Sequence, residues 1–315
     1  MALNKEVFKT RALSALIFVA VMMAGLLINH WSFLLLFVVI HFGCWFEYWK
    51  LIDKIYNVKM PVLFKYGIAA TGFSLFLAFC RYPYEAAGYS LNNNLVIPFA
   101  FAGFTAMAIG LIKADRGINI RAVLLSLLGL LYISVSLGTM IALRINDYDF
   151  GNGLVISLSN GISIPLLIIF SVWLNDTCAY LVGSFIGKTP FSKISPKKTW
   201  EGTIGGAILC IVIIGTAGSY LFFGKVTLLA FLIAAIGAVF GTLGDLWESK
   251  LKRMANVKDS GNMLPGHGGF LDRFDSMLLA TPIVWILVIM LQSVQYMPEH
   301  TYFCNSIYFN FHENS

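Results

Sequence analysis

Charged residues are scarce in this chain of 315 residues. They make up 12% of it, whereas an average soluble domain carries about 25%. Hydrophobic residues make up 58%, so too few polar side chains remain to cover a water-soluble globule of this length. The five cysteines form no CxxC pair, and they therefore indicate neither a disulfide framework nor a zinc site.

Long apolar runs are abundant. Stretches of about 17–25 apolar residues are typical of membrane-spanning helices. We predict an all-α, polytopic integral membrane protein with about nine transmembrane helices in a single membrane domain, residues 1–315. Its parts would be an N-terminal helical half (1–163), a half that carries the polar motifs (164–293) and a C-terminal tail (294–315). The nine apolar runs lie near residues 12–28, 31–48, 66–80, 95–112, 122–143, 164–183, 204–223, 227–247 and 276–293.

The first run is not typical of a signal peptide. It lacks a small-residue cleavage site, and a second apolar run follows almost at once. We therefore expect it to remain in the mature protein as the first transmembrane helix.

The basic residues predict the orientation in the membrane. With the N-terminus in the cytoplasm, nineteen of the 22 Lys and Arg fall on inside segments, and only Arg81, Arg144 and Lys225 fall outside. This agrees with the enrichment of cytoplasmic loops in Lys and Arg. The net charge of +6 therefore requires no nucleic-acid partner, and the basic face suits anionic membrane lipid.

The character of the chain changes after residue 164, where polar residues enter the sixth apolar run, and we expect little chemistry from the first five runs. Asn175 and Asp176 lie inside the sixth run. An ionisable residue within a span costs a few kcal/mol and usually faces a cavity or a partner. We interpret the pair as lining a polar pocket in the inner leaflet. A buried polar clamp between helices is the alternative.

The loop at 187–202 adds cations. Ser195 followed by Pro196 predicts a helix start, which would place Lys197 and Lys198 in the first turn. Cations are unfavourable there because the helix N-terminus is already positive. The pattern therefore favours an anion bound beside these lysines. Ordinary membrane-side lysines remain the alternative.

Residues 249–275 concentrate cations, carboxylates and glycines. Just before and within this stretch, Asp245, Ser249 and Lys252 are spaced to share one helix face. Asp245 and Asp272 come from different helices at the same membrane face and could converge on one Mg²⁺, or on two ions. The alternatives are a solvated helix end and a plain N-cap. The stretch also contains Arg253, Lys258, His267, Gly268, Gly269 and Arg273.

Glycines 266, 268 and 269 could aim several backbone N–H groups at an anion. The stretch lacks the GxxxxGK[ST] spacing of a P-loop and the GxGxxG of a dinucleotide fold. Glycine alone is a weak signal, and a single histidine such as His267 is more often a hydrogen-bonded loop residue than a catalyst.

Together these motifs resemble the signature of the phosphatidate cytidylyltransferases. The matching positions downstream are Ser249, Lys252, Arg253, Lys258, Asp259, Gly261, Pro265, His267, Gly268, Gly269, Asp272, Arg273 and Asp275. Those upstream are Asn175, Asp176, Thr177, Ala179, Tyr180, Gly187, Lys188, Ser195, Pro196, Lys197, Lys198, Thr199, Glu201 and Gly202. The resemblance covers residues 170–276 well, whereas the first five runs match only in being hydrophobic.

The resemblance implies a magnesium-dependent membrane enzyme that makes CDP-diacylglycerol and pyrophosphate from CTP and phosphatidic acid. Its metal-binding acids would be Asp245 and Asp272, and a second metal or a monovalent cation such as K⁺ stays open, as does a homodimer. We expect it in the cell (inner) membrane, with the active site on the cytoplasmic face. The candidate catalytic residues are Asp245, Asp272, Lys252, Arg253, Lys258, His267 and Arg273. The candidate substrate-binding residues are Asn175, Asp176, Lys197, Lys198, Thr199, Ser249, Gly268 and Gly269.

Three other classes of protein are alternatives. A transporter for an anionic solute would also have polar residues within spans, but it needs a midplane site between repeats, and no repeat is visible. Another lipid-phosphate enzyme is a second alternative, such as a polyprenol kinase or a CDP-alcohol phosphotransferase. The DGxxAR motif of the latter family is absent. A scaffold without activity would leave the acidic, glycine-rich stretch unexplained.

Overall fold

The computed structural model describes residues 5–81, 83–86, 88–114, 119–145, 148–149, 155–156, 161–192, 194–262 and 268–295. This part of the chain is almost entirely helical. Two short antiparallel hairpins interrupt it: β1 (Glu85–Ala86) pairs with β2 (Tyr89–Ser90), and β3 (Tyr148–Asp149) pairs with β4 (Val155–Ile156). The predicted all-α, polytopic architecture is confirmed.

Every predicted apolar run is helical. Within the part of the chain that the structure describes, seven helical stretches are long and apolar enough to cross a membrane, and one of them (Ile120–Arg144) runs through α5, η1 and α6. The apolar parts of α1 (Ala15–Leu27) and α3 are shorter. At 1.5 Å per residue, the 17 residues of α3 extend about 26 Å, slightly less than a hydrocarbon core of about 30 Å. The helices are α1 (Lys5–Leu27), α2 (His30–Tyr56), α3 (Val62–Ala78), α4 (Leu91–Ile112), α5 (Ile120–Gly129), the π-helical η1 (Leu130–Val135), α6 (Ser136–Ile145), α7 (Ser163–Ile186), α8 (Trp200–Phe223), α9 (Leu228–Met254) and α10 (Leu271–Gln295).

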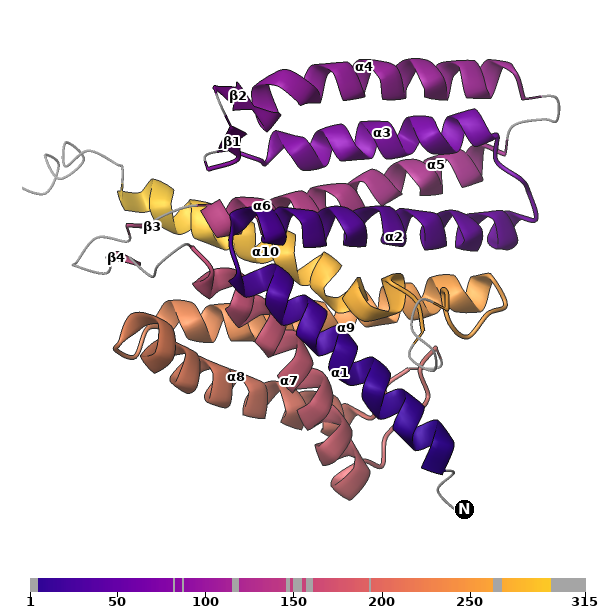
Figure 1. Ribbon diagram of the computed structural model, residues 1–315. Coiled ribbons are helices and arrows are strands. Elements are labelled where there is room, and N and C mark those ends of the chain that lie inside the picture. The colour runs from indigo at the N-terminus through magenta and orange to yellow at the C-terminus, as the bar shows by residue number, and fades with distance from the viewer. Residues whose placement is uncertain are drawn as a thin grey trace, which may run out of the picture.

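The helices form two groups joined by α10. Figure 1 shows α2, α3, α4 and α5 stacked on one side and α7, α8 and α9 on the other. Helix α10 runs between the groups and packs against α9, α7, α6 and α2. The start of α10 therefore lies where side chains from both halves of the sequence can meet.

Glycine lets α9 and α10 approach closely. A Cβ atom at Gly244 would lie 2.5 Å from the carbonyl oxygen of Asp275 and 3.0 Å from the Cα atom of Ser276. Small residues allow this backbone contact between membrane helices. Asp245 follows Gly244 directly, so the contact brings an acid of α9 next to the first turns of α10.

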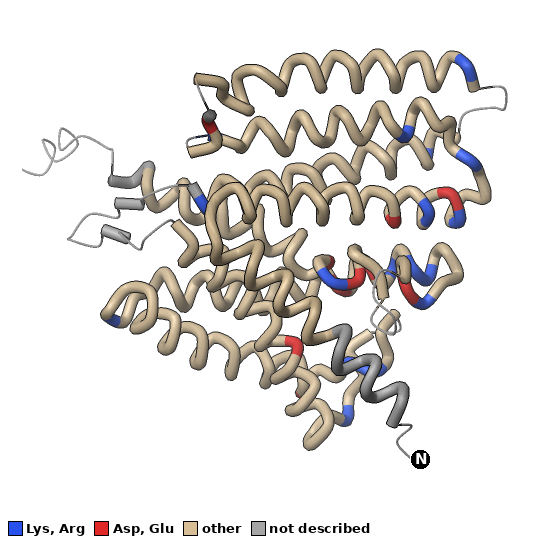
Figure 2. The backbone as a smooth tube through the Cα atoms, in the orientation of Figure 1, with Lys and Arg blue, Asp and Glu red and all other residues tan. Residues whose placement is uncertain are grey.

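Charged side chains gather at one end of the molecule. Figure 2 shows most Lys and Arg at the same end of the helices, with Asp and Glu interspersed and few charges at the opposite end. Lys54 lies in the last turn of α2, and Lys252 and Arg253 lie in the last turn of α9. The asymmetry read from the sequence is therefore also an asymmetry in space.

Candidate active site

A cavity of about 500 Å³ opens at this charged end. Its walls come from α7, from the loop before α8, from the first turn of α8, from α9 and from the start of α10. It therefore joins segments that lie far apart in the sequence. Of the residues predicted for the site, it is lined by Asp176, Lys197, Lys198, Thr199, Asp245 and Asp272.

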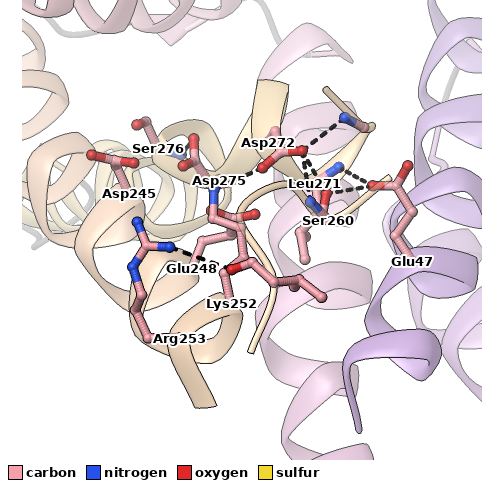
Figure 3. A network of polar contacts seen from close by, with 12 residues as sticks. Glu47, Asp245, Glu248, Lys252, Arg253, Ser260, Leu271, Asp272, Asp275 and Ser276 are labelled. Carbon is pink, nitrogen blue, oxygen red and sulfur yellow. Dashed lines mark hydrogen bonds and ion pairs between the residues drawn. The ribbon is translucent and has the colours of Figure 1, made fainter. Parts of the chain in front are cut away.

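Three carboxylates cluster beside this cavity. Asp245, Glu248 and Asp275 each offer an oxygen, and these atoms all lie within 4.8 Å of one another. Figure 3 shows them converging from α9 and α10. Two unit charges at that distance repel by about 3–4 kcal/mol at an effective dielectric constant of about 20. The cluster therefore needs nearby cations.

Two lysines supply part of that charge. The Lys198 Nζ forms an ion pair with Asp245, and the Lys252 Nζ forms one with Glu248. The third acid, Asp275, is 6% exposed and accepts the backbone N–H of Ser276 at 2.6 Å. Lys198 thus links the loop before α8 to Asp245 of α9.

The residues present fit a divalent cation. Glu248 is fully buried, and its Oε1 accepts no hydrogen bond from the described residues. Carboxylate oxygens are the ligands that Mg²⁺ prefers, usually one or two together with substrate phosphates. Three converging carboxylates, one with an unused buried oxygen, could hold such an ion.

Asp272 is engaged differently from Asp245. Its Oδ1 accepts the Lys252 Nζ at 2.7 Å, and its Oδ2 accepts the Ser260 N–H, the Ser260 hydroxyl and the Gly269 N–H at 2.9, 2.9 and 2.7 Å. Both acids line the same cavity. Asp272 therefore ties Lys252 and the loop before α10 together, and its sharing of a metal with Asp245 stays a prediction.

The start of α8 differs from the prediction. Ser195 and Pro196 form a turn, in which the Lys198 N–H donates to the Ser195 carbonyl at 3.1 Å, and the helix begins only at Trp200. Its N-cap is Thr199, whose hydroxyl accepts the Gly202 N–H at 3.1 Å. The helix thus starts after both lysines, as the positive end of the helix dipole favours.

The loop before α8 is closed by backbone hydrogen bonds between residues 189–191 and 198–200. The Phe191 N–H donates to the Lys198 carbonyl at 2.7 Å, and the Trp200 N–H donates to the Thr189 carbonyl at 2.9 Å. Glu201 accepts the N–H groups of Lys188 and Thr189. These bonds fix the backbone that carries Lys197 and Lys198 at the mouth of the cavity.

Two predicted residues lie buried beside the cavity without lining it. Asn175 is 2% exposed, and its amide donates to the Thr242 hydroxyl at 3.3 Å, which joins α7 to α9. This contact matches the alternative of a clamp between helices. Ser249 is buried within α9, and its predicted contact with substrate stays a prediction.

The remaining predicted cations lie on the surface. Arg253, Lys258 and Arg273 are exposed, and the Arg253 Nη1 donates to the Val257 carbonyl at 3.4 Å, just after α9 ends. His267 lies outside the described residues. Gly268 has a φ of +81°, and a Cβ atom there would lie 2.7 Å from Asp272 Oδ2. Gly268 therefore lies close to Asp272 with a positive φ, and contact of Gly268 and Gly269 with a bound anion stays a prediction.

Glu47 is a buried acid that the sequence analysis missed. It lies in α2, one of the first five apolar runs, from which we expected little chemistry. It is 5% exposed and accepts hydrogen bonds from Ser260, Phe270 and Leu271 beside the site, so the first five runs do contribute a buried acid next to it. An acid inside an apolar run is a functional candidate by default, so the signal was available in the run 31–48.

Comparison with known proteins identifies the family of this chain. The profile of the cytidylyltransferase family matches residues 9–291. The phosphatidate cytidylyltransferase of Staphylococcus saprophyticus is 35% identical over 250 residues, which is 74% of this chain and 94% of the relative. That of Staphylococcus aureus is 46% identical over 133 residues (42% and 51%), and that of Synechocystis is 40% identical over 138 residues (42% and 46%). An all-helical membrane fold, an acidic site lined with lysines and a match over nearly the whole length agree: the chain belongs to the cytidylyltransferase family.

Proposed function

We propose that this protein transfers CMP from CTP to phosphatidic acid, giving CDP-diacylglycerol and pyrophosphate in phospholipid biosynthesis. One observation carries the proposal. A single cavity joins Asp245 and Asp272 with Lys197 and Lys198 at the charged end of the membrane helices. The relatives that are named phosphatidate cytidylyltransferases support the choice of substrates.

The reaction is a substitution at phosphorus. An oxygen of the lipid phosphate attacks the α-phosphorus of CTP, the bond from that phosphorus to the β-phosphate oxygen breaks, and pyrophosphate leaves. The nucleophile is already an anion, so no strong base has to remove a proton. The barrier comes mainly from charge repulsion and from positioning, and the protein acts by holding anions in line.

Lysines and backbone groups would hold the phosphates. Lys197 and Lys198 lie in the cavity and would contact the triphosphate or the lipid phosphate. Asp176 would line the cleft for the lipid headgroup, with Asn175 beside it. The remaining predicted contacts to phosphate are those of Lys252, Arg253, Lys258, Arg273 and the backbone at 267–269, and Arg suits bidentate contact best.

Asp245, together with Glu248 and Asp275, would hold magnesium, and Asp272 is the further predicted ligand. A bound Mg²⁺ ion neutralises phosphate charge and stabilises the leaving pyrophosphate. The protein's own contribution is to orient Asp245 and Glu248 through their ion pairs with Lys198 and Lys252. A second cation such as K⁺ beside the same acids remains part of the proposal.

The chain is an integral membrane protein by its helices, and we place its active site on the cytoplasmic face of the cell membrane. The asymmetry of Lys and Arg along the sequence supports this orientation. The cavity opens at the end of the molecule where the Lys and Arg gather.

Position-specific labels on CTP test the activity. Purified protein with phosphatidic acid and Mg²⁺ is expected to move an α-phosphate label into lipid and to release a γ-phosphate label as pyrophosphate. Chelation of Mg²⁺, or diacylglycerol in place of phosphatidic acid, is expected to abolish the product. Lipid products are resolved by thin-layer chromatography.

The position of the label also separates the alternatives. A CTP-dependent lipid kinase would place the γ-label, not the α-label, in lipid. A transporter would give no lipid-linked cytidine at all. Either result with pure, folded protein would contradict the proposed function.

A further inference from the structure

Glu47 caps a helix that is not its own. The Phe270 N–H donates to Glu47 Oε1 at 3.0 Å, and the Leu271 N–H donates to Oε2 at 2.9 Å. A helix start leaves four N–H groups without partners inside the helix. A carboxylate there gains both the hydrogen bonds and the favourable end of the helix dipole. Figure 3 shows Glu47 reaching from α2 toward Ser260 and Leu271.

The same carboxylate reaches the site through Ser260. The Ser260 Oγ lies 2.8 Å from Glu47 Oε2 and 2.9 Å from Asp272 Oδ2. A hydroxyl has one proton, so it donates to one of the two carboxylates at a time. The Ser260 N–H stays on Asp272 at 2.9 Å. Ser260 thus joins an acid of the N-terminal half to an acid that lines the cavity.

The fit around Glu47 is tight. A Cβ atom at Gly261 would lie 2.0 Å from Glu47 Oε1, and one at Gly269 would lie 2.2 Å from Oε2. The backbone at Gly261 and at Gly269 therefore approaches the Glu47 carboxylate more closely than a side chain would allow. This close approach explains why glycine occupies both positions.

We propose that Glu47 is a positioning residue for cytidylyl transfer, an inference that rests on the proposed function. Glu47 orients Ser260 and the start of α10, and Ser260 in turn orients Asp272. Asp272 holds Lys252, which pairs with Glu248 of the acidic cluster. Glu47 is absent from the cavity wall, so it acts on the reacting groups through these neighbours.

The Glu47→Gln variant tests this role. It keeps the size of the side chain but replaces one acceptor oxygen with an NH₂ group. That group cannot accept a hydrogen bond from the N–H or O–H donor that faced the oxygen. We expect kcat to fall about 10- to 100-fold, which is the range for residues that orient a group of the active site without touching the substrate. The KM for CTP should stay within about threefold, because no cavity contact is removed.

Asp53→Asn is the matched control. Asp53 lies on the same helix and is also paired, but its partners are Lys65 and the Met60 N–H, neither of which belongs to α10. This control should keep wild-type kcat once both variants are corrected for the folded fraction. A purely structural Glu47 would lower the yield of folded protein and leave corrected kcat unchanged, and that result would overturn the inference.

Ser260→Ala provides a second, independent arm. It removes the shared hydroxyl with little change in volume, and we expect kcat to fall about 3- to 10-fold, less than in Glu47→Gln. Because both residues act on Asp272, the double variant should lose less than the product of the single effects. Multiplicative losses would reject the Ser260 link, and wild-type kcat in Ser260→Ala would reject it even if Glu47→Gln does not fold.

The assay also separates this inference from the proposed function. If the wild-type protein makes no CDP-diacylglycerol, the proposed function fails. If the wild-type protein is active and the variants are equally active, only this inference fails.

Discussion

Asp245→Asn is expected to abolish cytidylyl transfer while leaving the protein folded. Asp245 is the cavity acid that also belongs to the carboxylate cluster and pairs with Lys198. Its charge is needed to hold a cation against the phosphates. The loss of such electrostatic stabilisation costs about 10²- to 10³-fold in kcat. The labelled-CTP assay measures it directly.

Stability should respond differently from activity in this variant. The partly exposed pair with Lys198 contributes about 0–1 kcal/mol, whereas removing one of three crowded carboxylates relieves repulsion. The melting temperature of Asp245→Asn in detergent should therefore equal or exceed that of the wild type.

Metal binding gives a readout that is independent of turnover. Added Mg²⁺ should raise the melting temperature of the wild-type protein, since a ligand of the folded state stabilises it. It should not raise that of Asp245→Asn, and Asp53→Asn should respond as the wild type does. A normal Mg²⁺ response in Asp245→Asn would reject the metal assignment of this residue.

Asp272→Asn is expected to lose both activity and stability. Asp272 accepts four hydrogen bonds, one of them from the Lys252 ammonium group. Asn has a single acceptor oxygen, so buried donors lose their partner and Lys252 keeps only Glu248. We expect the free energy of unfolding to fall by about 3 kcal/mol, and transfer to fall about 10²-fold or more.

Denaturant unfolding and the transfer assay at low temperature separate the two effects. Lys252→Met provides the matched partner, and the double variant should be less destabilised than the sum of the single variants, because both break the same pair. Wild-type turnover in folded Asp272→Asn would reject its role in the site. Loss of activity without any loss of stability would instead favour direct metal binding over positioning.

The two aspartates illustrate how far motif reasoning reaches. Their spacing and their placement at helix ends predicted that both would face one site, and both line one cavity. The motif did not show that Asp272 accepts four hydrogen bonds. Nor did it show that Asp245 clusters with the carboxylates of Glu248 and Asp275. That difference depends on the positions of Ser260 and Gly269, both of which donate hydrogen bonds to Asp272.

Local properties were determined by the sequence alone. The helices follow from the apolar runs, the family from a dense motif between residues 170 and 276, and the charge asymmetry from the positions of Lys and Arg. Each is a property of neighbouring residues or of composition. For the same reason the start of α8 was misplaced. A serine followed by proline is a good local signal, but backbone hydrogen bonds between residues 189–191 and 198–200 close the loop, and the helix begins after its N-cap Thr199.

The role of Glu47 was decided by tertiary structure. Its partner Leu271 lies 224 positions away in the chain, and only the packing of α2 beside α10 brings the carboxylate to the helix start. Periodicity and spacing describe contacts within a few turns. The pairing of Lys198 with Asp245 and the shared Ser260 hydroxyl also arise between segments that approach one another only after the helices have assembled.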